Sequence, residues 1–282
     1  MSGNLALRTI ETSAAGYAPR RTNTQLAVDD LVAGVESWWL WSTLAWQDIR
    51  QRYRGSILGP FWLTISMAIM VGALGFLYSA IWKIEITTFL PYLTLGVLFW
   101  NLISSLINEG TSAFIRAESI MLQVRMPMTV HVLRSVVRNF IIFLHNCVVA
   151  AAVLLIFAVP QSLYSLVSLL GLFLILLNGI WVTLLLGMVC ARFRDIGPIV
   201  SSLTQIVFFL TPIIWMPDAL GNKFWVLYLN PVYAFLEIAR GPLLGHTIPM
   251  PVWGMAFGVT TVGFLVTFLF FARFRARIPF WV

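Results

Sequence analysis

The length of its uncharged runs is the feature that most constrains this chain. Residues 140–190 contain no Asp, Glu, Lys or Arg over 51 positions. About 20 apolar residues of helix cross a bilayer core, so this run is long enough for two crossings, and residues 160–162 (Pro-Gln-Ser) divide it. Four other runs of about 20 residues also lack charge. The sequence therefore predicts an all-α integral membrane protein with six transmembrane helices, at residues 59–82, 89–108, 140–159, 163–190, 196–217 and 252–272.

The composition excludes the common soluble classes. Apolar residues make up 60% of the chain and charged residues only 10%, against about 25% charged residues in an ordinary soluble domain. A soluble enzyme, a disordered chain and a disulfide scaffold are all excluded by this balance. Cys147 and Cys190 lie in or beside apolar runs and are predicted to be small buried hydrophobic side chains.

The few positive charges predict the orientation of the chain. Fifteen Lys and Arg residues fall on one predicted face of the membrane, and three, Lys83, Lys223 and Arg240, fall on the other. Lys and Arg are enriched in cytoplasmic loops, so both termini are predicted to be cytoplasmic. Residues 1–35 and 276–282 are interpreted as cytoplasmic tails, the first of them flexible, and residues 36–275 as one transmembrane domain.

Three segments outside the spans have patterns of their own. Residues 36–54 place Trp38, Trp41, Ala45, Ile49 and Tyr53 at helical spacing, with most polar residues opposite, which predicts an amphipathic helix along the inner membrane surface. Residues 112–124 predict a short helix in a cytoplasmic loop that docks into another protein or only connects two spans. Residues 218–251 are apolar but divided by Pro and Gly, which predicts a re-entrant outer segment or an interfacial helix.

The sequence carries no energy source that we can identify. It has no G-x-x-x-x-G-K-[ST] loop for ATP phosphates, and no His, Cys and carboxylate cluster with metal-ligand spacing. His145 is the only histidine in a predicted span, and a packing role is favoured over catalysis. The spans contain no carboxylate, whereas ion-driven transporters generally need ionisable groups there. A transport role would therefore need energy from a partner, and the chain is not expected to be an enzyme or to hold a metal or cofactor.

Most aromatic residues near span ends are interpreted as an interfacial belt. Some lie deeper, and their flat faces can stack on the C–H faces of sugar rings. They are candidates for the lining of a carbohydrate path, although ordinary packing is the alternative for each: Phe76, Tyr78, Phe99, Trp100, Phe208 and Phe209.

Four segments together resemble the ABC-2 type permeases that export polysaccharides such as O-antigen, capsule and teichoic acid. They are RYRGSILGPFW at 52–62, ARFRDI at 191–196, TPIIW at 211–215 and NPVYAFLEIAR at 230–240. The similarity runs in order over about residues 36–275. One departure is Ser66-Met67, where the family often has a proline after the first-span tryptophan.

The resemblance implies an assembly and assigns roles by position. It implies a homodimer with two copies of a cytoplasmic ABC ATPase, which binds ATP and Mg, and a channel for lipid-linked polysaccharide between the permeases. Residues 36–54 would form the interface helix. The ATPase-coupling residues would be Phe114, Ile115, Arg116, Glu118, Arg192, Arg194 and Asp195. The outer gate would include Asn230, Pro231, Glu237 and Arg240.

The predicted function is that of the permease subunit of an ATP-driven exporter in the bacterial inner membrane, with O-antigen for lipopolysaccharide as the first candidate cargo. The lipid-pyrophosphate end would meet Arg50, Arg52 and Arg54, whose planar guanidinium groups pair with phosphate, beside Trp38 and Trp41 of the interface helix. The alternatives are an ABC-2 exporter of a small molecule or drug, an intramembrane enzyme that uses His145, and a scaffold without a transport role. No nucleic-acid partner is expected.

Overall fold

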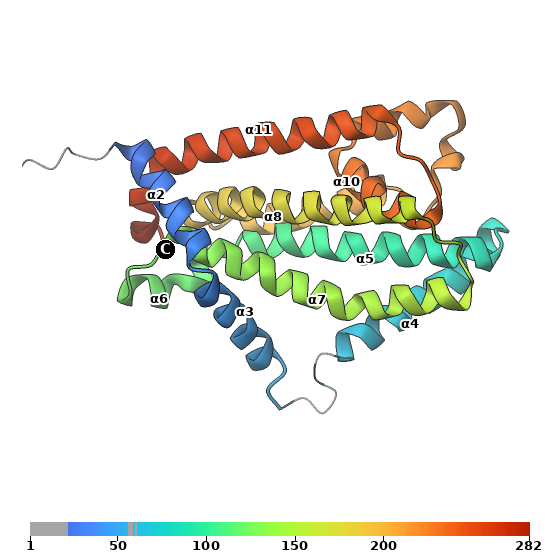
Figure 1. Cartoon of the computed structure of the whole chain (residues 1–282), viewed down its shortest axis with the longest axis horizontal. Coiled ribbons are helices and arrows are strands. Elements are labelled where there is room, and N and C mark those ends of the chain that lie inside the picture. The colour runs from blue at the N-terminus through green and yellow to red at the C-terminus, as the bar shows by residue number, and fades with distance from the viewer. Residues whose placement is uncertain (1–21, 56–58, 60) are drawn as a thin grey trace, which may run out of the picture.

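The computed structural model describes residues 22–55, 59 and 61–282, and all regular secondary structure in these ranges is helical. Five helices are long and apolar enough to cross a membrane: α4 (Phe61–Trp82), α5 (Ile86–Gly110), α7 (Met128–Ile156), α8 (Val167–Arg192) and α11 (Met250–Phe274). They run side by side along the long axis of the molecule (Figure 1). Residues 1–21 of the predicted tail, and residues 56–58 and 60 of the first similar segment, lie outside the described residues.

The fifth predicted span is shorter than expected. Helix α9 covers Ile196–Leu210, about 22 Å at 1.5 Å per residue, whereas a bilayer core is about 30 Å thick. The helix ends because Pro212 disfavours helical geometry at the residue before it, and Thr211 is extended with φ −96° and ψ 135°. Residues 211–216 are irregular, so a continuous helix over 196–217 is wrong, and the count of six spans stays a prediction.

Helix α7 begins earlier than its predicted span, at Met128 instead of residue 140. Pro127 occupies the position before its first turn. Arg134 and Arg138 therefore belong to the helix and not to a loop. The connection after α5 is correspondingly shorter, and holds a 3-10 turn (Ile115–Ala117) followed by α6 (Glu118–Gln123).

Both predicted tails are partly structured. Residues Asn23–Glu36 form α2, which begins at a capping box between Thr22 and Gln25. Asp30 of α2 is buried, accepts hydrogen bonds from the backbone amides of Met128 and Thr129, and pairs with Arg275 at 2.7 Å. The C-terminal residues Arg275–Phe280 form a 3-10 helix. The two tails therefore lie together at the start of α7. Residues 23–35 are helical, which corrects the prediction that the range 1–35 is flexible throughout.

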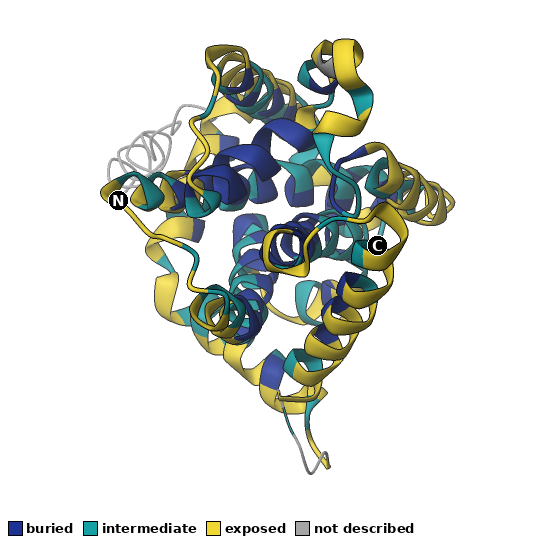
Figure 2. Ribbon diagram, turned by 90° about the vertical axis from the view of Figure 1, so that its right-hand side faces the viewer, coloured by how far each residue is buried: buried dark blue, intermediate teal, exposed yellow. Residues whose placement is uncertain are grey.

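Helix α5 is the centre of the bundle, with ten consecutive buried residues from 91 to 100. It packs against α4, α7, α8, α9 and α10 (Pro231–Arg240), and buried residues gather in the middle of the end-on view (Figure 2). By contrast, α4 and α9 each bury only a few residues. The outward faces of α4 and α9 are therefore free to meet lipid, water or another chain.

The segment between α9 and α11 is broken, as the sequence predicts. A 3-10 stretch (Pro217–Leu229) kinks at Gly221, whose φ of 49° suits glycine. Helix α10 then packs between α5, α8 and α11, at the end of the bundle opposite α2 and the C-terminus (Figure 1). Whether this segment re-enters a membrane stays a prediction.

Candidate functional site

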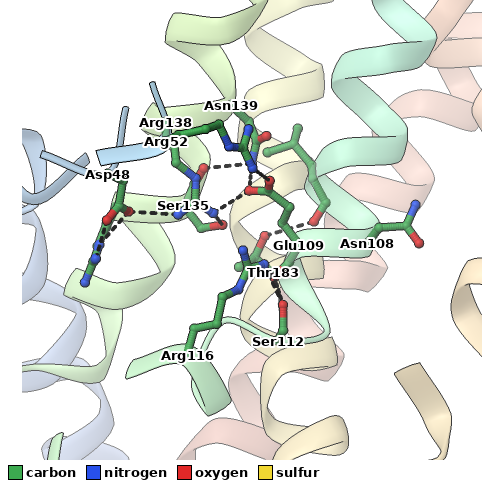
Figure 3. A network of polar contacts seen from close by, with 12 residues as sticks. Asp48, Arg52, Asn108, Glu109, Ser112, Arg116, Ser135, Arg138, Asn139 and Thr183 are labelled. Carbon is green, nitrogen blue, oxygen red and sulfur yellow. Dashed lines mark hydrogen bonds and ion pairs between the residues drawn. The ribbon is translucent and has the colours of Figure 1, made fainter. Parts of the chain in front are cut away.

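A network of charged side chains joins three elements at the α2 end of the bundle, which the charge pattern predicts to be cytoplasmic (Figure 3). Helix α3 (Trp38–Arg52) runs at an angle to the long helices and carries the first acid. Helix α7 supplies two arginines one turn apart, on one face, and α5 supplies a carboxylate in its last turn. We call this set the ionic network: Asp48, Arg52, Glu109, Arg134 and Arg138.

Asp48 connects α3 to α7. Arg134 donates to it through Nε at 2.8 Å and through Nη2, and Arg138 donates through Nη1 at 2.8 Å. Burial acts to raise the pKa of Asp48, but the hydrogen bonds and charges of the two arginines outweigh it and hold the pKa below its usual range. The sequence pattern placed most polar residues of 36–54 on the face opposite the tryptophans, but the side chain of Asp48 turns toward α7.

Glu109 connects α5 to the same arginines. It accepts hydrogen bonds from Arg138 and from Asn139 at 2.9 Å, and Arg52 of α3 reaches it at 3.1 Å. Arg116, in the turn after α5, donates to the Glu109 carbonyl at 3.1 Å. A displacement of this turn would therefore act on α3, α5 and α7 together.

Helix α3 corresponds to the predicted interface helix at residues 36–54. It packs on α7 through Ala45 and Ile49, which are buried. Trp38 is exposed and Trp41 partly buried. Of the three arginines assigned to pyrophosphate, Arg50 and Arg54 are exposed, whereas Arg52 is paired with Glu109. The phosphate role stays a prediction for all three.

The predicted coupling residues divide into buried and accessible ones. Phe114 is fully buried in a cluster with Leu184 and Met188, so it cannot enter a partner's groove as predicted, because it anchors the turn to α8. Ile115 is partly buried, while Arg116 and Glu118 are exposed. The exposed apolar side chains of this segment are Leu122 and Val124, which the prediction did not name. Arg192, Arg194 and Asp195 are exposed in the connection to α9.

A groove of about 460 Å³ lies between α4, α5 and α9. Trp100 of α5 packs on Phe208 of α9 with ring centroids 5.4 Å apart, and Phe209 adjoins Phe208 at 5.3 Å. The groove also carries uncharged polar groups. Its lining includes Asn101, Ser104, Asn108, Ser201, Thr204 and Gln205.

The structure brings together three of the six aromatic residues predicted to line a path. Trp100, Phe208 and Phe209 border the groove. Phe99 does not, because it is buried against Phe143 in the core, which corrects that assignment. Outside the groove lining, Phe76 is exposed on α4, and Tyr78 packs on Trp82 with centroids 5.2 Å apart.

The predicted gate residues hold the irregular segment that follows α9. Asn230 caps α10 through its side-chain oxygen and donates to the Thr211 hydroxyl at 2.9 Å. Arg240 is fully buried, pairs with Glu237 at 2.7 Å and donates to the Pro212 carbonyl at 2.8 Å. Pro231 starts α10, where its missing N–H costs nothing.

A cavity of about 580 Å³ adjoins the predicted gate residues Glu237 and Arg240 at the α10 end. The ring of Tyr92 lies under the guanidinium of Arg240, at 4.1 Å. The Tyr92 hydroxyl shares its one proton between the carbonyls of Pro212, at 2.8 Å, and Trp215, at 3.0 Å. Backbone carbonyls freed by the break at Pro212 are thus satisfied by side chains, as buried carbonyls require.

Sequence reasoning missed the ionic network. Asp48 and Glu109 lie far apart along the chain and carry no motif, and the only available signal was a pair of arginines spaced by four at 134 and 138. Among the described residues no group of three or more His, Cys, Asp and Glu side chains is placed to hold a metal ion. The Nδ1 atom of His145 lies 2.8 Å from the carbonyl of Ile141 on the same helix, a contact typical of a packing residue.

Comparisons with known proteins identify relatives over most of the chain. The family model described as ABC-2 type transporter matches residues 40–244. The O-antigen export system permease protein RfbA of Myxococcus xanthus is 25% identical over 218 residues, 73% of this chain and 81% of that protein. A permease of the same name from Klebsiella pneumoniae is 24% identical over 207 residues, 72% of this chain and 79% of that protein. A second Klebsiella pneumoniae permease of that name is 22% identical over 229 residues.

Proposed function

Since the chain belongs to the ABC-2 type transporter family, we propose that it is the permease subunit of an ATP-driven exporter of lipid-linked polysaccharide in the inner membrane. The first candidate cargo is O-antigen, the polymer in the names of three relatives. The single observation that carries this proposal is the groove between α4, α5 and α9, which combines aromatic faces with uncharged polar groups.

Two amide side chains of the groove, those of Asn101 and Gln205, need water or a ligand. Gln205 is exposed on an apolar helix, and neither it nor Asn101 makes a side-chain hydrogen bond to any described residue. A lipid tail offers no hydrogen bond, and an amide left without one costs several kcal/mol. Hydroxyl-rich sugar and water satisfy amides, while the sugar's C–H faces stack on Phe208 and on Phe209, which is exposed. Trp100 is only 7% exposed and supports this surface by packing on Phe208.

A second copy of the chain would close the groove. The outward faces of α4 and α9 are largely exposed in the single chain. Two copies related by a twofold axis would bring the same two helices together from each side. This arrangement converts an open groove into a channel between permeases, with both termini of each copy in the cytoplasm.

Energy would come from two copies of a cytoplasmic ABC ATPase that bind ATP and Mg. Leu122 of α6 and Val124 directly after it are exposed and offer apolar contacts to such a partner. When the ATPases close on ATP, the turn after α5 would move, and Arg116 would pass the motion to Glu109 and thus to α3 and α7. The lipid-pyrophosphate end of the cargo would meet Arg50 and Arg54, which are not engaged by Glu109.

The test is export from cells whose own copy of the gene is deleted. Gln205→Leu and Phe209→Ala are each expected to reduce surface polysaccharide while the protein remains in the membrane. Phe257→Ala is the matched control, because Phe257 is an exposed aromatic residue on α11 outside the groove lining. Groove variants that export as much polysaccharide as the control would refute the proposal that the polymer passes along this groove. Normal surface polysaccharide in the deletion strain would favour a small-molecule exporter instead.

Mild-detergent purification tests the partner separately. A co-purifying chain with ATPase activity is expected, and purification of the permease alone under all conditions would count against ATP-driven export.

A further inference from the structure

A second cavity, of about 230 Å³, lies between α3, the turn after α5 and the first turns of α7. It is distinct from the groove and lies at the opposite end of the bundle from the α10 gate. The polar residues that line it are Asp48, Arg116, His131, Arg134, Ser135 and Arg138.

Both ring nitrogens of His131, which lines this cavity, are buried without a hydrogen-bond partner. The residue is only 3% exposed. A buried polar group without a partner costs about 1–3 kcal/mol. An imidazole so placed beside a cavity indicates a ligand or water that supplies the missing contact.

The arginines also retain unused donors. The Nε atom of Arg138 is buried without a partner. The hydrogen bonds of Arg134 to Asp48 use Nε and Nη2, and those of Arg116 use Nη2. Within the described residues, Nη1 of Arg134 and both Nε and Nη1 of Arg116 therefore remain available.

The charges around the cavity do not balance. The lining carries three positive charges, on Arg116, Arg134 and Arg138, and one negative charge, on Asp48. Beside it, Glu109 pairs with Arg52 and Arg138, so that with Arg52 and Glu109 included the count is four positive charges against two negative ones. The neighbouring acid of α2, Asp30, is already paired with Arg275 and with backbone amides of α7. An excess of two positive charges in a partly buried space is unfavourable without a counter-ion.

We propose that this cavity binds a phosphate group, held by Arg116, Arg134 and Arg138 with a hydrogen bond from His131. Guanidinium groups bind phosphate oxygens through paired, charge-assisted hydrogen bonds. A dianionic phosphate would balance both excess charges, and the phosphodiester of a lipid headgroup would balance one of them. The phosphate comes from an anionic lipid headgroup of the inner leaflet or from solution. The site does not use Arg50 or Arg54 and does not depend on which cargo the protein carries.

Such a ligand would also bridge the elements that the ionic network joins. It would connect the turn after α5, through Arg116, to α7, through His131 and Arg138. Binding should therefore raise the stability of the folded chain, because a ligand that binds only the folded state stabilises it by mass action.

The test uses the full chain in lipid nanodiscs and measures its thermal unfolding. The first arm uses phosphatidylcholine alone and compares inorganic phosphate with chloride at equal ionic strength. The second arm adds no phosphate and compares phosphatidylcholine with discs that contain phosphatidylglycerol. A rise in the unfolding temperature in the first arm identifies phosphate from solution, and a rise in the second arm alone identifies a lipid headgroup.

Two variants and one control separate a ligand site from a structural role. Arg116→Gln should raise the ligand concentration that gives half of the maximal rise in unfolding temperature about tenfold, because one charge-assisted hydrogen bond is lost. His131→Leu should weaken the response about threefold to tenfold, because one hydrogen bond to the phosphate is lost. It should not lower the basal unfolding temperature, because it replaces a polar group that has no partner. Arg125→Gln, an exposed arginine outside the cavity, should respond as the native chain does.

Two results would overturn the proposal. One is a native chain that responds to neither phosphate nor phosphatidylglycerol, which would leave the cavity to water or to an acidic side chain of a protein partner. The other is a response that both His131→Leu and Arg116→Gln retain in full.

Discussion

Asp48→Asn should release α3 from α7 while the long helices stay folded. The substitution keeps the size of the side chain but removes the charge that three guanidinium hydrogen bonds converge on. It leaves Arg134 and Arg138 without their shared partner in a site where the Asp48 side chain is 12% exposed. Because Ala45 and Ile49 still pack on α7, the remaining contact is apolar and weaker.

The magnitude lies between two limits. An exposed ion pair is worth about 0–1 kcal/mol, and breaking a fully buried pair costs about 3–5 kcal/mol. The partial exposure of Asp48 and Arg134 places the cost near 2 kcal/mol, which corresponds to about a 30-fold increase in the opened population of α3.

Hydrogen exchange followed by mass spectrometry measures this opening directly, because amide exchange reports local opening free energies. Amides of α3 should exchange about 30-fold faster in Asp48→Asn, and those of α8 should not change. A double-mutant cycle with Arg134→Gln should give a coupling energy of about 1–2 kcal/mol. The control is Glu118→Gln, an exposed carboxylate of α6. Unchanged α3 exchange, or an equal change in the control, would refute the reasoning.

Three further predictions follow from the same contacts. Gly171→Ala should reduce the yield of folded protein in detergent, because its Cβ would lie 2.6 Å from the Ala239 backbone and force α8 from α10. Arg240→Met should lower the free energy of unfolding by about 3–5 kcal/mol, because the buried Glu237 loses its partner at 2.7 Å, and adding Glu237→Gln should recover part of this in thermal unfolding. Because the pKa of Asp48 is lowered in the folded chain, its ionised form stabilises the fold fully above the ordinary carboxyl pKa of about 3.9, and this stabilisation is lost as the pH falls below that value. Between pH 5 and pH 3 the unfolding temperature of Asp48→Asn should therefore fall less than that of the native chain.

The sequence predicted the fold class and the family because both depend on features that are local along the chain. Uncharged runs place α4, α5, α8 and α11 close to their observed positions, and the matched family model spans all four segments that carried the resemblance. The bounds of α7 and α9 were wrong for identifiable reasons. Charged residues mark the end of an apolar run but not the end of a helix, and Thr211-Pro212 ends a helix inside an apolar run.

The candidate site was less predictable because its members are distant in sequence. Trp100, Phe208 and Phe209 were predicted as path residues and do border one groove, but Phe99, one residue from Trp100, faces the core. Spans that are apolar on all sides give no periodic signal for the direction of a side chain. The pairing of Asp48 with Arg134 also needs the angle at which α3 crosses α7, which no local pattern encodes.

The sequence by itself determined that this chain belongs in a membrane, that its basic residues gather on one predicted face, and that it has no nucleotide loop of its own. These are properties of composition and spacing, and they do not depend on how the helices are arranged. Only the tertiary structure decided which charges are partners, which aromatic residues share a groove, and which arginine donors remain unused around His131. Those facts depend on distances between helices, because a hydrogen bond needs its two atoms within about 3 Å.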